Sequence, residues 1–178
     1  MEEYEELEKM NESIVSFAAD WERKLADCLP LFGHRNWIVV ADSAYPAQSN
    51  VGIETIIAGE DHVHVVRRVL DAIRASIHVR ASVYLDRELE YVEESDAPGI
   101  AEFKQQLDAV LYGSKVSRIP HEQIIHELDQ SARLFRILAI KTEMTIPYTS
   151  VFFELDCGYW NAEAEERLRQ AMPTAGLR

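Results

Sequence analysis

The sequence has only two cysteines, Cys28 and Cys157, which lie far apart and form no C-x-x-C pair. This argues against a disulfide framework and against a cysteine-based zinc site. Low cysteine content without such patterns is typical of proteins in a reducing compartment. We therefore expect a cytoplasmic protein whose fold depends on its hydrophobic core.

Basic residues are also scarce: the chain has 18 lysines and arginines but 31 aspartates and glutamates, which gives a net charge of −13. Such a chain is repelled by nucleic-acid phosphates and by anionic membrane surfaces. No run of apolar residues approaches the roughly 20 needed to span a bilayer. The acidic N-terminus resembles neither a secretory signal nor a transit peptide. The sequence thus predicts no nucleic-acid and no membrane partner.

The seven glycines are too scattered to build a G-x-G-x-x-G or a G-x-x-x-x-G-K-[ST] phosphate loop, and no G-x-S-x-G motif is present. The six histidines do not show metal-ligand spacing either. On a helix, His62 and His64 lie about 200° apart, and His121 and His126 about 140° apart, so neither pair forms an i, i+4 clamp. We expect no metal and no cofactor.

Apolar residues make up 47% of the 178 residues, which is enough for one domain spanning 1–178. Apolar β-branched runs alternate with helical periodicity along the chain. This alternation predicts an α/β fold, a three-layer α/β/α sandwich with a largely parallel central sheet. The predicted strands are 37–41, 53–58, 78–85, 116–119, 134–140 and 151–155, and the predicted helices are 12–29, 62–74, 100–111, 120–133 and 163–172.

The run from Trp37 to Ala41 is the most distinctive strand, because it is apolar throughout. A strand of this kind is typically buried on both faces of a parallel sheet. His34 stands just before it and Asp42 just after it. Because ligands gather at strand ends in α/β folds, both side chains are candidates for a site. The alternative is that the histidine caps a turn and the aspartate caps the next helix.

Because no cofactor motif is present, the remaining candidates for a functional site are side chains that transfer protons or bind hydroxyl groups. They are His34, Asp42, His121 and the run 147–150, Pro-Tyr-Thr-Ser. Histidine titrates near neutral pH and serves as an acid or a base, while carboxylates, phenols and hydroxyls bind the hydroxyls of a polar substrate. This set suits a reaction that only moves protons. Ordinary structural roles remain open for Tyr148 at a strand entrance and for His121 on a helix surface.

Three short motifs resemble the RbsD/FucU family of sugar-ring isomerases, the D-ribose pyranases and L-fucose mutarotases. The first is Gly-His at 33–34, an apolar strand, Asp-Ser-Ala at 42–44 and Pro46. The second is His-Glu-Gln at 121–123, and the third is the 147–150 run followed by an apolar strand. Their order and rough spacing agree with the family over residues 20–158.

The resemblance implies an RbsD-like fold and a cofactor-free mutarotase or pyranase that acts on a ribose- or fucose-like monosaccharide. It implies His34 as the proton donor. It implies Asp42, His121, Tyr148 and Ser150 as sugar contacts, although Ser150 stands where the family has asparagine. Two segments are additions to the family pattern, an acidic N-terminal helix at about 1–20 and a C-terminal helical extension at about 159–178.

Spacing also bears on assembly. His34 and Asp42 are eight residues apart, and a strand between them separates them by roughly 20 Å. A monosaccharide is too small to touch both. Unless the strand is shorter than predicted, each site combines His34 of one subunit with Asp42 of a neighbour. We therefore predict a homo-oligomer, in agreement with the ring-like assemblies of the family.

Two other functions remain open. One is a monosaccharide-binding or regulatory protein of the same fold that lacks turnover, which the serine at position 150 and the added ends favour. The other is an interaction protein that uses the acidic N-terminal segment.

Overall fold

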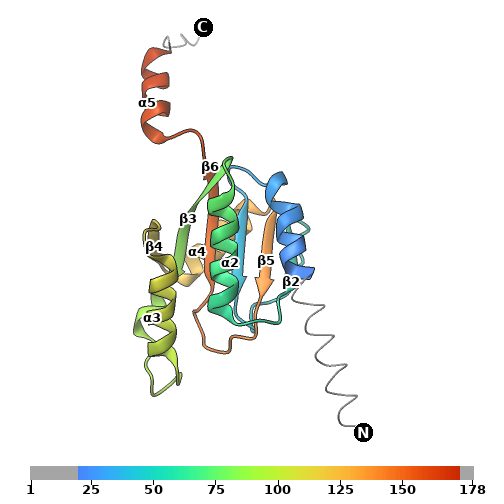
Figure 1. Cartoon of the computed structure of the whole chain (residues 1–178), viewed down its shortest axis with the longest axis vertical. Helices are drawn as coiled ribbons and strands as arrows, with labels where there is room; N and C mark the ends of the chain where they lie inside the picture. The colour runs from blue at the N-terminus through green and yellow to red at the C-terminus, as the bar shows by residue number, and fades with distance from the viewer. Residues whose placement is uncertain (1–19, 173–178) are drawn as a thin grey trace.

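The computed structural model describes residues 20–172. A six-stranded sheet with the order β2-β5-β1-β6-β3-β4 forms its centre (Figure 1). The strands are β1 (Trp37–Ala41), β2 (Ile53–Ile57), β3 (Val79–Asp86), β4 (Val116–Ile119), β5 (Ile137–Lys141) and β6 (Val151–Cys157). β2, β5 and β1 pair in parallel, as do β3 and β4, whereas β6 is antiparallel to both of its neighbours.

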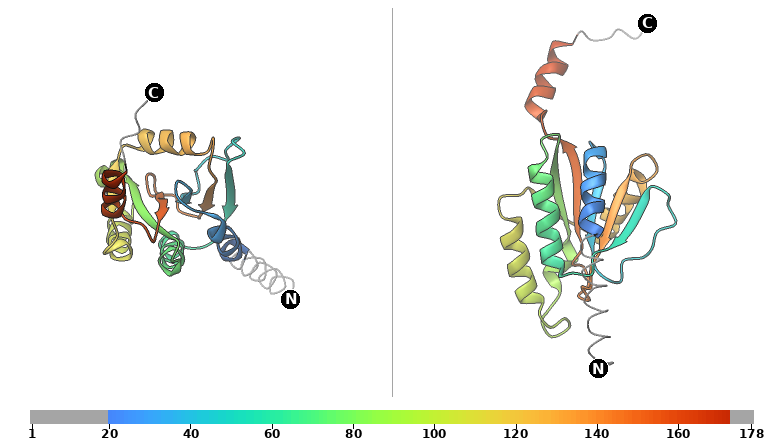
Figure 2. Two further views of the ribbon diagram at one scale, coloured as in Figure 1. Left: turned by 90° about the horizontal axis from the view of Figure 1, so that it is seen from above. Right: turned by 45° about the vertical axis from the view of Figure 1, so that its right-hand side comes forward.

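Helices cover both faces of the sheet (Figure 2). One face carries the helix of residues 20–28, α2 (His62–Ala75) and α3 (Ile100–Leu111), and the other carries α4 (His121–Ser131). Each face has its own apolar cluster, because successive strand residues point to opposite sides. Ile38 and Val40 pack toward the three helices, while Trp37 and Val39 pack toward α4. The predicted three-layer α/β/α sandwich is confirmed.

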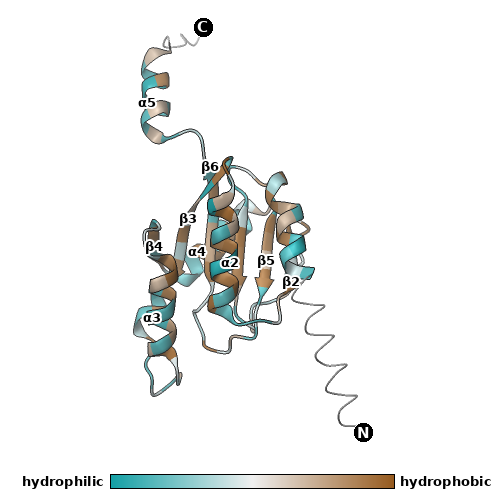
Figure 3. Ribbon diagram, viewed as in Figure 1, coloured by the Kyte–Doolittle hydropathy of each residue, from teal (hydrophilic) through white to brown (hydrophobic). Residues whose placement is uncertain are grey.

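β1 occupies the middle of the sheet, between β5 and β6, and all five of its residues are buried. The central strands are accordingly hydrophobic, whereas the helices mix hydrophobic and hydrophilic residues (Figure 3). α2 begins where Asp61 accepts a hydrogen bond from the His64 N–H, as expected of an N-cap. Its buried stripe includes Val66 and Val69, as the helical spacing predicts.

The predicted strand at 134–140 begins too early. The N–H groups of Leu134 and Phe135 bond to the Ser131 carbonyl, so the end of α4 continues into turns before β5 starts at Ile137. Leu134 is exposed despite its apolar character. A second difference is a short 3₁₀ helix, η2 (Arg87–Tyr91), in the acidic stretch between the strand predicted at 78–85 and the helix predicted at 100–111, where no element was predicted.

The helix predicted at 163–172 is present as α5 (Ala162–Ala171), which has no buried residue and extends away from the sheet (Figure 1). The predicted acidic helix at about 1–20 lies outside the described residues, apart from residue 20. Within residues 20–172, none of the helices combines the length and apolar character that crossing a membrane requires.

Candidate functional site

One edge of the sheet collects polar side chains from four strands. Asp42 follows β1, Asp86 is the last residue of β3, and His121 begins α4 two residues after β4 ends. Parallel strands end at the same edge, and antiparallel β6 begins there, which brings Ser150 to the same place. This is the edge at which α/β sheets bind ligands.

These side chains line a cavity of about 330 Å³, which we call the Asp42 cavity. Four residues predicted as ligand contacts line it together, namely Asp42, His121, Tyr148 and Ser150. Asp86 lines it as well. The volume is at the small end of the range for small-molecule sites, so it suits a compact polar ligand.

Asp42 is held by hydrogen bonds on both sides. Its Oδ1 accepts from the Ala44 N–H at 2.9 Å, and its Oδ2 accepts from the Ser150 hydroxyl at 3.2 Å. The alternative that Asp42 caps the next helix is wrong, because its bond to Ala44 closes a turn and the next element is β2. Further lone pairs remain on the carboxylate. Ser150 is buried and its hydroxyl is directed at Asp42, so this serine orients the carboxylate.

Tyr148 sits on a backbone with a φ of +59°, in the left-handed region. For a residue other than glycine this conformation costs about 1 kcal/mol. It places the phenol ring edge-to-face with the His121 imidazole, with centroids 5.7 Å apart. Strain of this kind is concentrated at ligand sites, which supports a role for Tyr148 in the cavity.

Asp86 is the site residue that the sequence prediction missed. It is 1% exposed, and its Oδ1 lies 3.1 Å from His121 Nδ1. The two groups are close enough for an ion pair but are not aligned as a hydrogen bond, since neither atom has a hydrogen-bond partner in the described structure. Burial raises the pKa of Asp86 to about 6, although His121 opposes this shift. The sequence did contain a signal for this residue, because Asp86 directly follows the predicted strand 78–85, just as Asp42 follows the predicted strand 37–41.

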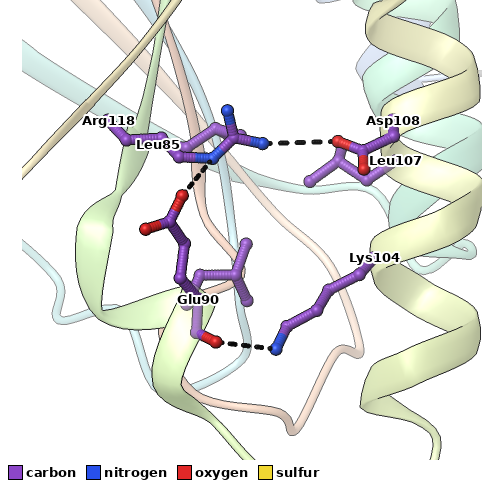
Figure 4. A pocket seen from close by; sticks show the side chains of 7 residues that line it. Leu85, Glu90, Lys104, Leu107, Asp108 and Arg118 are labelled. Carbon is purple, nitrogen blue, oxygen red and sulfur yellow. Dashed lines mark hydrogen bonds and ion pairs between the residues drawn. The ribbon is translucent and has the colours of Figure 1, made fainter.

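The first turn of α4 is also fixed. Both Glu88 carboxylate oxygens accept from the His121 backbone N–H, at 3.0 and 3.2 Å. Glu88 belongs to η2. The contacts that anchor η2 lie around a cavity of about 350 Å³ between η2, α3 and β4 (Figure 4). There Arg118 pairs with Glu90 and Asp108, each at 3.3 Å, and Lys104 donates to the Glu90 carbonyl at 3.3 Å. These pairs hold η2 in place rather than offering free groups to a ligand.

A buried histidine lies next to the carboxyl ends of β1 and β5. His62 is 1% exposed, and its Nδ1 is 2.7 Å from the Thr142 hydroxyl oxygen. Because the Thr142 hydroxyl donates to the Ala41 carbonyl, it accepts from His62. Burial lowers the pKa of His62 to about 4, so the imidazole is neutral at physiological pH.

His34 lies at the other edge of the sheet, before β1, and does not line the Asp42 cavity. Its Nδ1 is 2.8 Å from Asp156 Oδ1, and Arg80 donates to the other oxygen at 2.8 Å. The Arg35 Nε–H donates to His34 Nε2 at 3.2 Å, so Nε2 carries the lone pair and Nδ1 the proton. His34, Asp156 and Trp160 line a separate cavity of about 540 Å³ beside α5, the His34 pocket.

Asp156 remains ionised in this setting. Burial alone would raise its pKa, but hydrogen bonds from Arg80, from the Cys157 N–H and from His34 hold the pKa below its ordinary value. The structure therefore brings four of the five predicted residues together and leaves the fifth at the opposite end of β1. Among residues 20–172, no three His, Cys, Asp or Glu side chains are grouped so as to hold a metal ion.

Comparison with known proteins gives a family and a fold. The model of the RbsD / FucU transport protein family matches residues 21–157. RbsD of Bacillus subtilis, solved in complex with D-ribose, is 16% identical with a TM-score of 0.53, over 75% of this chain and 91% of that one. The fucose mutarotase of Streptococcus pneumoniae, solved with L-fucose, is 18% identical with a TM-score of 0.49, over 75% and 91%. No curated protein sequence matches the chain.

Proposed function

Because the chain belongs to the RbsD / FucU family, we propose that it binds a monosaccharide in the Asp42 cavity and interconverts its ring forms or anomers by general acid–base catalysis. The observation that carries this proposal is the convergence of Asp42, His121, Tyr148 and Ser150 on one cavity of about 330 Å³. RbsD of Bacillus subtilis, whose fold is similar, was solved with D-ribose.

The reaction needs only proton transfers. A base removes the proton of the anomeric hydroxyl while an acid protonates the ring oxygen, and the bond between the anomeric carbon and the ring oxygen breaks. Closure on the other face, or through another hydroxyl, reverses these transfers. A positioned acid or base contributes about 10²–10⁴-fold to such a step. Carboxylate, imidazole and phenol groups of the cavity provide hydrogen bonds for the sugar hydroxyls.

In this proposal the proton donor is His34 of a neighbouring copy. Within one chain β1 separates His34 from Asp42, and its five residues alone span roughly 17 Å. The His34 side chain is 59% exposed, so it is accessible to a second copy. The complete site then requires a homo-oligomer in which the His34 edge of one subunit meets the Asp42 cavity of the next.

Saturation-transfer NMR tests the activity directly, with ribose, fucose, galactose and rhamnose as the panel. We expect the wild-type protein to accelerate anomer or ring-form exchange of at least one sugar, and His34→Ala to abolish the acceleration. His64→Ala is a matched control, because His64 is an exposed histidine on α2, away from both pockets. Exchange at the wild-type rate in His34→Ala would remove His34 from the mechanism.

A second candidate function is sugar binding without turnover. It is favoured by Ser150, whose hydroxyl donates to Asp42 instead of being free for a sugar, where the family has an amide. A binding titration run beside the exchange measurement separates the two functions. Saturable binding of a sugar with no acceleration of exchange selects the binding protein.

A further inference from the structure

The proposed reaction needs two proton-transfer groups, and His34 provides only one. We propose that His121 is the second, a catalytic base inside the Asp42 cavity, and that Asp86 is its positioning residue. In this arrangement Asp86 holds the proton on His121 Nδ1, which leaves the lone pair of Nε2 for the sugar. The inference rests on the proposed function, since it assigns a role within the same site.

The first argument is the burial of Asp86. Its carboxylate oxygens are inaccessible to solvent, and they have no hydrogen-bond partner among residues 20–172. Buried carboxylates are costly to a fold unless they are paired. Within the described part of the chain, the one basic group at ion-pair distance is His121, with Nδ1 at 3.1 Å. Asp86 therefore has one available partner, and that partner lines the cavity.

The second argument is the orientation of His121. Its backbone N–H is fixed by Glu88, and its ring packs edge-to-face against Tyr148. Nδ1 is buried against Asp86, yet one third of the side chain remains exposed. The exposed part is thus the opposite side of the ring, which carries Nε2. Hydrogen bonds of catalytic groups are often poorly aligned without substrate and tighten when it binds, which fits the close but misaligned contact with Asp86.

The charges around Asp86 agree with this role. Three titratable groups act on its carboxyl, His121 from α4, Glu88 from η2 and Asp42 after β1. Burial raises the pKa of Asp86, His121 lowers it, and the two carboxylates raise it, with the result at about 6. Asp86 is therefore mainly ionised at neutral pH and accepts the Nδ1 proton. A carboxylate that fixes the tautomer of a neighbouring imidazole in this way makes it an effective base.

The proton balance of the step is complete. His121 Nε2 takes the proton of the anomeric hydroxyl, and the electrons of that O–H bond form the carbonyl of the open-chain sugar. The bond to the ring oxygen breaks, and the ring oxygen receives a proton from His34 of the neighbouring copy, which enters the step as the imidazolium, with a proton on Nε2 in place of the Arg35 contact and Nδ1–H still on Asp156. When the ring closes again, both protons return to their original nitrogens. No oxidant, reductant or co-reactant is consumed.

Asp86→Asn tests the dyad, because the amide has the same shape but donates a proton where the carboxylate accepts one. We expect kcat for sugar exchange to fall by about 10²-fold while KM changes less than about threefold, since the Asp86 carboxylate oxygens are closed to solvent and act on the sugar through His121. In ¹⁵N NMR of the ring, the His121 proton should move from Nδ1 to Nε2. Asp86→Glu should recover part of kcat. Glu127→Gln, an exposed carboxylate on α4, is the control.

Wild-type kcat together with an unchanged His121 tautomer in Asp86→Asn would overturn the proposal. If Asp86→Asn does not fold, His121→Gln decides, because loss of exchange with sugar binding retained is expected and undiminished exchange would contradict the base role. If the wild-type protein accelerates exchange of no sugar in the panel, the proposed function fails. The tautomer measurement still reports on the Asp86–His121 contact in that case, so the two failures are distinguishable.

Discussion

An aspartate next to a histidine is found near each end of β1, but the two pairs lie in different environments. At the Asp42 cavity, Asp86 lies 3.1 Å from His121 and is 1% exposed, and burial raises its pKa to about 6. At the His34 pocket, Asp156 lies 2.8 Å from His34 in a half-exposed setting, and its pKa is lowered. The difference shows that burial and the number of donors, rather than the pairing itself, decide the direction of the shift.

This contrast suggests that the two aspartate–histidine pairs have different roles. The buried pair belongs to a formed cavity that can hold a compact ligand, whereas the exposed pair presents an imidazole outward with its tautomer already set by Arg35. One strand keeps the two apart within a subunit. In the proposed mechanism, a complete acid–base site therefore needs the cavity end of one copy and the exposed end of another.

The largest effect is expected at the cavity end. Asp42→Ala removes a charged hydrogen-bond acceptor from the site and should weaken sugar binding by about 10–100-fold, or roughly 1.5–3 kcal/mol. Isothermal titration with the preferred sugar measures it. Asp71→Ala, an exposed aspartate on α2, is the control. Unchanged affinity in Asp42→Ala would place the sugar elsewhere.

A second prediction concerns stability against pH. The folded pKa of His62, about 4, is below its ordinary 6.5, so its contribution to stability is lost as pH falls from 6.5 to 4. The folded pKa of Asp86, about 6, is above its ordinary 3.8, so its contribution is lost as pH rises through 6. Each contribution is about 2–3 kcal/mol, and the two oppose each other between pH 4 and 6.

Single variants separate these contributions. Asp86→Asn should be about 2 kcal/mol more stable than wild type at pH 8, and it should lose stability on acidification from pH 6.5 to 4. His62→Gln should instead gain stability as pH falls from 6 to 4. Urea denaturation at a series of pH values gives both slopes. Parallel pH profiles for the two variants and the wild-type protein would contradict the assigned directions.

An aspartate-to-asparagine substitution at the His34 end of β1 should change the stability of the fold less than Asp86→Asn does. Asp156→Asn breaks the contacts with His34 and Arg80, but partly exposed ion pairs contribute less than about 1 kcal/mol. Thermal unfolding of Asp156→Asn beside Asp86→Asn at pH 8 compares the two ends directly. A loss of stability at Asp156 well above 1 kcal/mol would show that the His34 end is more tightly coupled to the fold than its exposure indicates.

The smallest effect is expected for α5. Since the helix has no buried residue, ending the chain after Gly158 should change the free energy of unfolding by less than about 0.5 kcal/mol. Chemical denaturation measures this change. A large loss of stability would show that α5 packs against another copy of the chain, because none of its residues is buried in its own subunit.

Local patterns predicted much of this fold. β1 was predictable because all its residues are apolar, and the positions of His34 and Asp42 at its two ends followed from the direction of the strand. The orientation of β6 was also accessible, since the connection 142–150 is too short for the crossover that parallel strands need. By contrast, Leu134 was placed in a strand because its apolar character gave no sign of the turns that follow α4.

The role of Asp86 could not be predicted with the same ease. It joins the cavity because β3 lies two strands from β1 in the sheet and because α4 starts beside it, and strand order depends on long-range packing. The contact of His34 with Asp156 has the same origin, since 122 positions separate the two residues. Sequence patterns identify candidate groups at strand ends, but the fold decides which of them meet.

The most direct test of a site shared between copies is complementation between two inactive variants. His34→Ala and His121→Gln, each expected to be inactive alone, are co-expressed with different affinity tags, and mixed assemblies are purified through both tags. Random assortment leaves both groups intact in about one quarter of the sites, so sugar exchange should return to about one quarter of the wild-type rate. Mixed assemblies as inactive as either variant, or a fully active wild-type monomer, would contradict the shared site.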